Sequence, residues 1–322
     1  MNKQPDPTYA VTALLWREVA VYTVPMYRFD ISERGIAMKL VDYDTEQYRD
    51  YARGRALSAE QLRVWIDAFA AVLPERRPLI GLDVGSGTGR FTPALAEAFG
   101  PVTGIEPSVR MREIAESQAR PTDTHSPGAA AAQARPTDTH SPEAAAAQGR
   151  RSDVRYVAGA AEDLPMPDGS ADYALMFLSW HHVADKAGAV RELTRALRPG
   201  GRLLLRANFR DHHPRPWWLE YFPRGYEVDA AIFQPLHEVI AMFTAAGWRV
   251  ASFDLVTEPS PGTRADMLER LRLRTLSFFA QLSPGEQDEG LRRIERAVAE
   301  DPGAPSPAFA EPLLTFERSH DV

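Results

Sequence analysis

The chain has 322 residues, of which 44% are hydrophobic and 25% are charged. These values are those of an ordinary globular protein, and they exclude a disordered, collagen-like or coiled-coil chain. Its 37 basic and 44 acidic side chains give a net charge of −7 without any lysine- or arginine-rich run, so we expect neither a nucleic-acid nor a membrane partner. The absence of cysteine excludes disulfides, thiolate metal sites and a cysteine nucleophile.

The N-terminal segment precedes the first recognisable element. Residues 1–40 contain an apolar stretch, but Arg17 and Glu18 interrupt it, and no cleavage site follows a basic start. No segment approaches the roughly 20 apolar residues that a membrane-spanning helix needs. We therefore expect a cytoplasmic protein in which residues 1–40 form an extension. Residues 44–73 predict one or two helices, which carry Tyr48, Tyr51, Arg53 and Arg55.

Short apolar runs alternate with helical patterns from residue 78 onward. This alternation is typical of a parallel sheet covered by helices on both faces. We therefore predict an α/β, doubly wound domain over residues 41–322. The predicted strands are 78–84, 102–105, 154–157, 172–180 and 202–207, and the predicted helices are 91–99, 108–118 and 187–197.

A tandem duplication interrupts the alternation. The sequence ARPTDTHSPGAAAAQ at 119–133 is followed by ARPTDTHSPEAAAAQ at 134–148. Two copies without large apolar residues have nothing to bury, so we interpret residues 119–150 as a flexible surface insertion. Its histidines, His125 and His140, have no ligand-like neighbours, and we predict no metal site.

The C-terminal part breaks the alternation a second time. Residues 265–300 have helical spacing, and PLLTFERS at 312–319 predicts a strand. If this strand returns to the edge of the sheet, residues 264–302 form a helical insertion rather than a separate domain.

A glycine-rich loop follows the first predicted strand. The segment LDVGSGTG at 82–89 lies between a strand and a helix, which is the context of a cofactor-binding loop. Glycines permit unusual dihedrals and close approach of a ligand, and the following helix offers free N–H groups. The dinucleotide pattern G-x-G-x-x-G fails, because Arg90 occupies its sixth position. The observed pattern is G-x-G-x-G.

This loop, with three downstream features, resembles the first motif of the class I S-adenosylmethionine-dependent methyltransferases, closest to their small-molecule, type 11-like group. Glu106 ends the second strand, where these enzymes bind the ribose hydroxyls, and residues 161–165 follow the third strand, where they line the adenine. Residues 198–201 (RPGG) form the turn before the fifth strand. The resemblance covers about residues 43–256 without the insertion.

The resemblance implies a Rossmann-like, mostly parallel seven-stranded sheet with a helical lid formed by the N-terminal helix and a C-terminal helical excursion. It also implies S-adenosyl-L-methionine as the cofactor. The residues that it places at this cofactor are Asp83, Gly85, Ser86, Gly87, Thr88, Gly89, Glu106, Pro107, Ala161, Glu162, Asp163 and Ser179.

Candidate acceptor-side residues follow the fourth predicted strand, at His181 and His182. A histidine with a pKa near neutrality can take a proton from a hydroxyl or orient it, so we predict a catalytic role for at least one, against the alternative of a structural role. Adjacent side chains diverge and no third ligand is evident, so the pair is not a predicted metal site. The aromatic stretch 215–223 either walls a substrate pocket or fills a small core of its own.

The resemblance implies an enzyme that methylates a small organic acceptor, and the Ala-, Arg-, Pro- and Gly-rich composition suits secondary metabolism. One alternative is a regulatory protein that binds S-adenosylmethionine without catalysis. Another is a protein or RNA methyltransferase, which the acidic balance and the absence of an Asn-Pro-Pro-Tyr type site disfavour. An arsenite-type enzyme is excluded because it needs cysteine. We expect a monomer or a homodimer.

Overall fold

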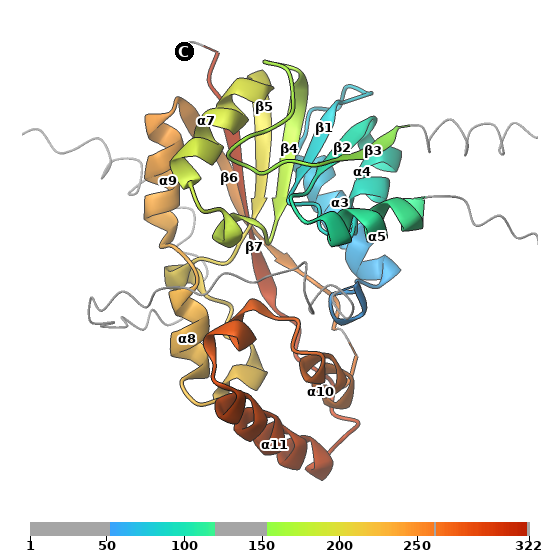
Figure 1. Cartoon of the computed structure of the whole chain (residues 1–322), viewed down its shortest axis with the longest axis vertical. Helices are drawn as coiled ribbons and strands as arrows, with labels where there is room; N and C mark the ends of the chain where they lie inside the picture. The colour runs from blue at the N-terminus through green and yellow to red at the C-terminus, as the bar shows by residue number, and fades with distance from the viewer. Residues whose placement is uncertain (1–51, 120–152, 261, 321–322) are drawn as a thin grey trace, which may run out of the picture.

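The computed structural model describes residues 52–119, 153–260 and 262–320. Its strands form one seven-stranded sheet in the order β3-β2-β1-β4-β5-β7-β6 (Figure 1). The predicted α/β, doubly wound class is therefore confirmed. The repeat at 120–148, Tyr48 and Tyr51 lie outside the described residues, and the division into an extension, a domain and two insertions stays a prediction.

The first five strands are parallel, so their carboxyl ends share one edge of the sheet. β5 begins at Leu197 and includes the predicted turn at 198–201, because the chain already pairs with β4 there, across a register shift after Ala171. The other strands agree with the predictions, except that the first begins at Gly81 rather than at residue 78 and the fourth ends before residue 180. That strand stops at Phe177, because Leu178 has a φ of 57° and residues Trp180–His182 form a 3-10 turn. The five are β1 (Gly81–Val84), β2 (Val102–Ile105), β3 (Val154–Val157), β4 (Ala171–Phe177) and β5 (Leu197–Arg206).

The last strand lies inside the sheet. β7 (Ala310–Arg318) pairs antiparallel with β5 on one side and with β6 (Trp248–Thr257) on the other. The expectation that it forms the sheet edge is therefore wrong. The physical reason is in its composition, since residues 312–316 are all buried, whereas β6 alternates with exposed residues and can face solvent at the edge.

Helices cover both faces of the sheet. α3 (Ala59–Val72), α4 (Thr92–Phe99) and α5 (Val109–Ala119) lie on one face, and α7 (Lys186–Ala196) and α9 (Leu236–Ala245) lie on the other (Figure 1). α3 begins at Ser58, whose side chain and that of Gln61 form a capping box, and it buries Trp65 and Phe69 against the sheet. No helix in the described part of the chain is long and apolar enough to cross a membrane.

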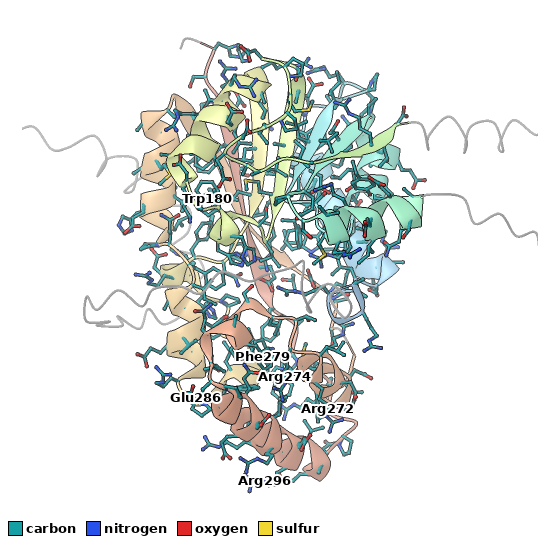
Figure 2. All side chains as sticks on the ribbon, in the orientation of Figure 1. Trp180, Arg272, Arg274, Phe279, Glu286 and Arg296 are labelled. Carbon is teal, nitrogen blue, oxygen red and sulfur yellow. The ribbon has the colours of Figure 1, made fainter. Side chains whose placement is uncertain are left out.

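A helical group lies beyond the carboxyl edge of the sheet (Figure 1). It consists of the short helix η3 (Trp217–Tyr221), α8 (Gly225–Ala231), and the segment between β6 and β7, which contains α10 (Arg264–Arg272), η4 (Ser277–Gln281) and α11 (Pro284–Glu300). These helices share an apolar cluster in which Trp218, Phe222, Phe278 and Phe279 make ring contacts. Figure 2 shows Phe279 in this group and Trp180 in the sheet half of the molecule.

Candidate functional site

The glycine-rich loop connects β1 to α4 at the carboxyl edge of the sheet. Gly85, Gly87 and Gly89 have φ values of 73°, 55° and 77°, a region that favours glycine. A Cβ at position 85 would lie 2.5 Å from the Cβ of Ser179, and one at position 89 would lie 2.3 Å from the Tyr156 hydroxyl. Backbone conformation and close packing therefore both require glycine at the two ends of the loop.

Ser179 fixes the loop from the neighbouring strand. Its hydroxyl donates a hydrogen bond of 2.8 Å to the carbonyl of Val84, the last residue of β1. The bond joins the ends of β1 and β4 directly beneath Gly85. Ser179 was predicted to contact the cofactor, and the structure places its side chain under the loop backbone.

Glu106 follows β2 and lies against the loop. Its Oε2 accepts a hydrogen bond of 2.9 Å from the Gly87 amide, and its Oε1 accepts one of 3.0 Å from the Ser108 amide. A carboxylate has about four lone-pair positions, so these backbone bonds leave acceptor capacity for a ligand. The side chain is thus held in one orientation beside the loop. Pro107, also a predicted cofactor residue, is exposed and leads the chain into α5.

The polar side chains within the loop motif face inward. Ser86 and Thr88 are 8% and 1% exposed, and the Ser86 hydroxyl is buried without a hydrogen-bond partner among the described residues. Asp83 is also buried and accepts a hydrogen bond of 2.6 Å from the Thr92 hydroxyl at the start of α4. Burial raises the pKa of Asp83 to about 6, although the bond from Thr92 lowers it. Any cofactor contact of Ser86 or Thr88 is therefore expected from the backbone.

The segment after β3 reaches the same edge of the sheet. Residues 160 and 163 form an isolated antiparallel bridge, which makes a tight turn around Ala161 and Glu162. Ala161 is buried, Glu162 lies near the start of α7, where its carboxylate faces Lys186, and Asp163 is exposed. The predicted adenine-lining residues therefore offer one exposed carboxylate at this edge.

The two histidines lie in the 3-10 turn after β4. Their rings are 4.0 Å apart, and the Nε2 atoms of His181 and His182 lie 3.4 Å and 3.5 Å from the hydroxyl of Ser277 in η4. Burial lowers the pKa of His182 to about 4, with Arg55 and Lys186 adding to the shift. The pKa of His181 is also well below its ordinary value, first because of burial. The expectation of a near-neutral pKa is therefore not met, and both rings are uncharged at pH 7.

These low pKa values give a testable pH dependence. Above pH 5 we expect no activity change from titration of His182, because its protonated form accumulates only as the pH falls through about 4. The unfolded chain binds a proton near pH 6.5 and the folded chain near pH 4, so folded-state stability falls as the pH drops between these values. Histidine titration by NMR measures both rings, and an ionisation near pH 6.5 that disappears in His182→Gln would contradict the prediction.

A cavity of about 210 Å³ lies beside this turn. It is bounded by residues 54–57, the ends of β4 and β5, the loop at 214–218 and the segment from α10 to η4. Arg90, the residue that follows the glycine-rich loop, lines the cavity, and residues 85–89 do not. Of the predicted acceptor-side residues, His181 and Trp218 line the cavity and His182 does not. Arg55, from the helix predicted to form the lid, lines it as well.

The aromatic stretch 215–223 after β5 contributes both to a cavity wall and to an apolar core, which were the two alternatives predicted from its sequence. Trp218 lines the cavity and is also 7% exposed within the apolar cluster of the helical group. Trp217 instead donates a hydrogen bond of 3.2 Å to the Ser306 hydroxyl, and its ring lies under Arg264. Only one end of the stretch therefore faces a ligand-sized space.

Several cavity residues were not identified from the sequence. Arg206 is the last residue of β5, and Asn208 lies two residues beyond it. Both are at the carboxyl edge of the sheet, where the same position led to the prediction of Glu106. Arg270 and Ser277 belong to the helical group, and only the packing of that group brings them to the sheet. No local pattern in the sequence marks these two.

The chain is similar in sequence to known methyltransferases. Residues 82–205 match the family model described as a methyltransferase domain. The chain is 31% identical over 148 residues to a demethylmenaquinone methyltransferase of Staphylococcus aureus, and the alignment covers 45% of this chain and 49% of that protein. The chain thus spans about half the length of the curated relatives it matches.

Solved structures share the fold at low sequence identity. A candidate methyltransferase from an antibiotic biosynthesis pathway of Anabaena variabilis has a TM-score of 0.58 and 21% identity, over 80% of this chain and 99% of that one. Phosphoethanolamine N-methyltransferase 2 of Haemonchus contortus, solved in complex with S-adenosyl-L-methionine, has a TM-score of 0.51 and 15% identity, over 86% of this chain and 59% of that one. The segment that matches the methyltransferase-domain family model, residues 82–205, contains the glycine-rich loop, Glu106 and the β4 turn.

Proposed function

We propose that this protein is a methyltransferase that transfers the methyl group of S-adenosyl-L-methionine to a small organic molecule. The observation that carries the proposal is the cavity that is lined by Arg90, the residue that follows the glycine-rich loop, and is closed by the helical group. Its volume of about 210 Å³ lies below the range of roughly 300–1,000 Å³ typical of sites for drug-sized ligands. A cavity of this size suits a small acceptor rather than a folded protein or an RNA.

The residues at the carboxyl edge fit the cofactor. The loop at Gly85–Gly89 presents a backbone that a ligand can approach closely, and Glu106 has spare lone pairs for the two ribose hydroxyls. The exposed carboxylate of Asp163 is a further hydrogen-bond acceptor at the same edge of the sheet. When bound, the cofactor supplies a methyl group on a positively charged sulfur.

The protein must then bind the methyl acceptor, exclude water from it and allow the proton of the acceptor to leave. The cavity is mostly apolar where Phe177, Trp218 and Phe233 line it, which restricts water. His181 is a neutral ring whose Nδ1 has no hydrogen-bond partner in the described structure. We infer that His181 orients a polar group of the acceptor, because a ring with so low a pKa is a weak base.

The test is a binding and turnover measurement on the whole chain. We expect S-adenosylhomocysteine to bind in calorimetry, and a labelled methyl group to move from S-adenosylmethionine to small acceptors. A regulatory protein would bind both sulfur ligands but never consume the donor. Transfer of the label to protein or RNA rather than to small molecules would contradict the proposed acceptor class, and preferential binding of NAD would contradict the cofactor.

A further inference from the structure

The carboxylates that line the cavity have hydrogen-bond or ion-pair partners within the protein, whereas two of the arginines that line it form no ion pair with any residue that the structure describes. Four arginines and three carboxylates line it. Asp229 accepts a hydrogen bond of 2.7 Å from His213, and Glu258 accepts bonds of 3.0 Å and 2.5 Å from Gln61 and Trp65. The third carboxylate, Glu311, forms an ion pair with Arg206. All three acids are therefore engaged by protein donors.

Two of the arginines have no such partner. Neither Arg55 nor Arg270 forms an ion pair with a carboxylate in the described part of the chain. The Nε atom of Arg55 is buried without a hydrogen-bond partner there, and so is the Nε of Arg206. An unsatisfied buried donor is unfavourable, so these nitrogens favour an acceptor group supplied by a ligand.

The side chains that line the cavity carry more positive than negative charge, since four arginines face three carboxylates. Burial is the first cause of the low pKa values of both histidines, and the positive charge of Arg55 contributes to each. Arg206 adds to the shift at His181. The remaining wall is apolar, formed in part by Phe177, Trp218 and Met267. A ligand that fits this cavity therefore combines an anionic end with an apolar body.

We propose that the methyl acceptor is a small aromatic acid whose carboxylate is bound by Arg55 and Arg270 and whose hydroxyl or amino group, at the other end, takes the methyl group. Its oxygen or nitrogen would form the new bond to the methyl carbon as the sulfur–methyl bond breaks, S-adenosylhomocysteine would leave, and the acceptor's proton would pass to solvent. This inference rests on the proposed function and specifies its substrate class. Arginine presents a planar fork of N–H donors that matches a carboxylate, and such charge-assisted bonds are roughly twice as strong as neutral ones. The aromatic body lies against Phe177 and Trp218, which leaves the other end of the acceptor toward the glycine-rich loop.

The test compares acids with their neutral amides. The probes are benzoate, 4-hydroxybenzoate and 3-phenylpropanoate, each paired with its primary amide, measured by calorimetry on the full chain saturated with S-adenosylhomocysteine. We expect at least one acid to bind tenfold or more tightly than its amide. Arg55→Gln and Arg270→Gln should each weaken that acid by roughly 10- to 100-fold without changing amide or S-adenosylhomocysteine affinity.

Arg272→Gln is the matched control. Arg272 lies on the same helix as Arg270 but is exposed and pairs with Glu269 and Glu295 away from the cavity, and Figure 2 shows it in the helical group. This variant should bind the acid as the natural chain does. Equal binding of acids and amides, or no binding of any acid, would overturn the proposal while S-adenosylhomocysteine still binds. Loss of S-adenosylhomocysteine binding in the natural chain would instead overturn the proposed function.

Discussion

Gly85→Ala should destabilise the folded chain by roughly 2–5 kcal/mol. A non-glycine residue at a φ of 73° costs roughly 1–2 kcal/mol in backbone strain. The new Cβ would also lie 2.5 Å from the Cβ of Ser179, and overpacking of this kind typically costs roughly 1–3 kcal/mol. Ser179 cannot withdraw freely, because its hydroxyl is bound to the Val84 carbonyl.

Chemical denaturation measures this loss, and calorimetry should show weaker cofactor binding as the loop shifts. The control is Gly285→Ala in the first turn of α11, where a Cβ would meet no atom within 4 Å. That substitution should be neutral or stabilise the chain by up to roughly 1 kcal/mol, because alanine favours a helix. Equal effects of the two substitutions would show that packing between β1 and β4 does not fix the loop.

Glu106→Gln should weaken S-adenosylhomocysteine binding by roughly 1–3 kcal/mol, or about 5- to 150-fold. The neutral amide loses the charge-assisted bonds to the ribose hydroxyls. In the natural chain, the two carboxylate oxygens of Glu106 accept hydrogen bonds from the Gly87 and Ser108 amides. The glutamine has only one oxygen, so its NH₂ group would face one of these backbone N–H groups, and that hydrogen bond would be lost. Calorimetry measures the affinity.

Glu113→Gln is the matched control, because Glu113 is an exposed acid on the nearby helix α5 and pairs only with Arg110 among the ion pairs of the described residues. It should leave the affinity unchanged. If both variants bind S-adenosylhomocysteine as the natural chain does, Glu106 only fixes the loop, and the ribose is bound elsewhere.

The parts of the site that follow from strand order could be predicted from the sequence. The Gly85–Gly89 loop and Glu106 each follow an apolar run, and parallel strands bring such positions to one edge. The sequence therefore predicted that Glu106 and the loop lie close together, although not which atoms form the hydrogen bond. The inward orientation of Ser86 and Thr88 was not, because it depends on how α4 and β2 pack beneath the loop.

The acceptor side depended on tertiary packing and was predicted less completely. The near-neutral histidine pKa failed because burial beneath Ser277 and the charge of Arg55 act across long sequence separations. The interior position of β7 had a signal in the sequence, since the mostly apolar run PLLTF at 312–316 is typical of a strand that is covered on both faces. Arg270 had none, because an arginine beside the buried Leu271 on an amphipathic helix has no pattern that distinguishes it from other helix arginines.

The interior place of β7 has a consequence for folding during synthesis. β6 leaves the ribosome with both of its edges unpaired, and its partner β7 begins at Ala310, after Thr257 and a further helical segment. At roughly 5–20 residues per second, β7 follows on a timescale of several seconds. During that interval the open edges of β5 and β6 are templates for pairing with other chains, so a chaperone that binds exposed strands would act on this protein at that stage.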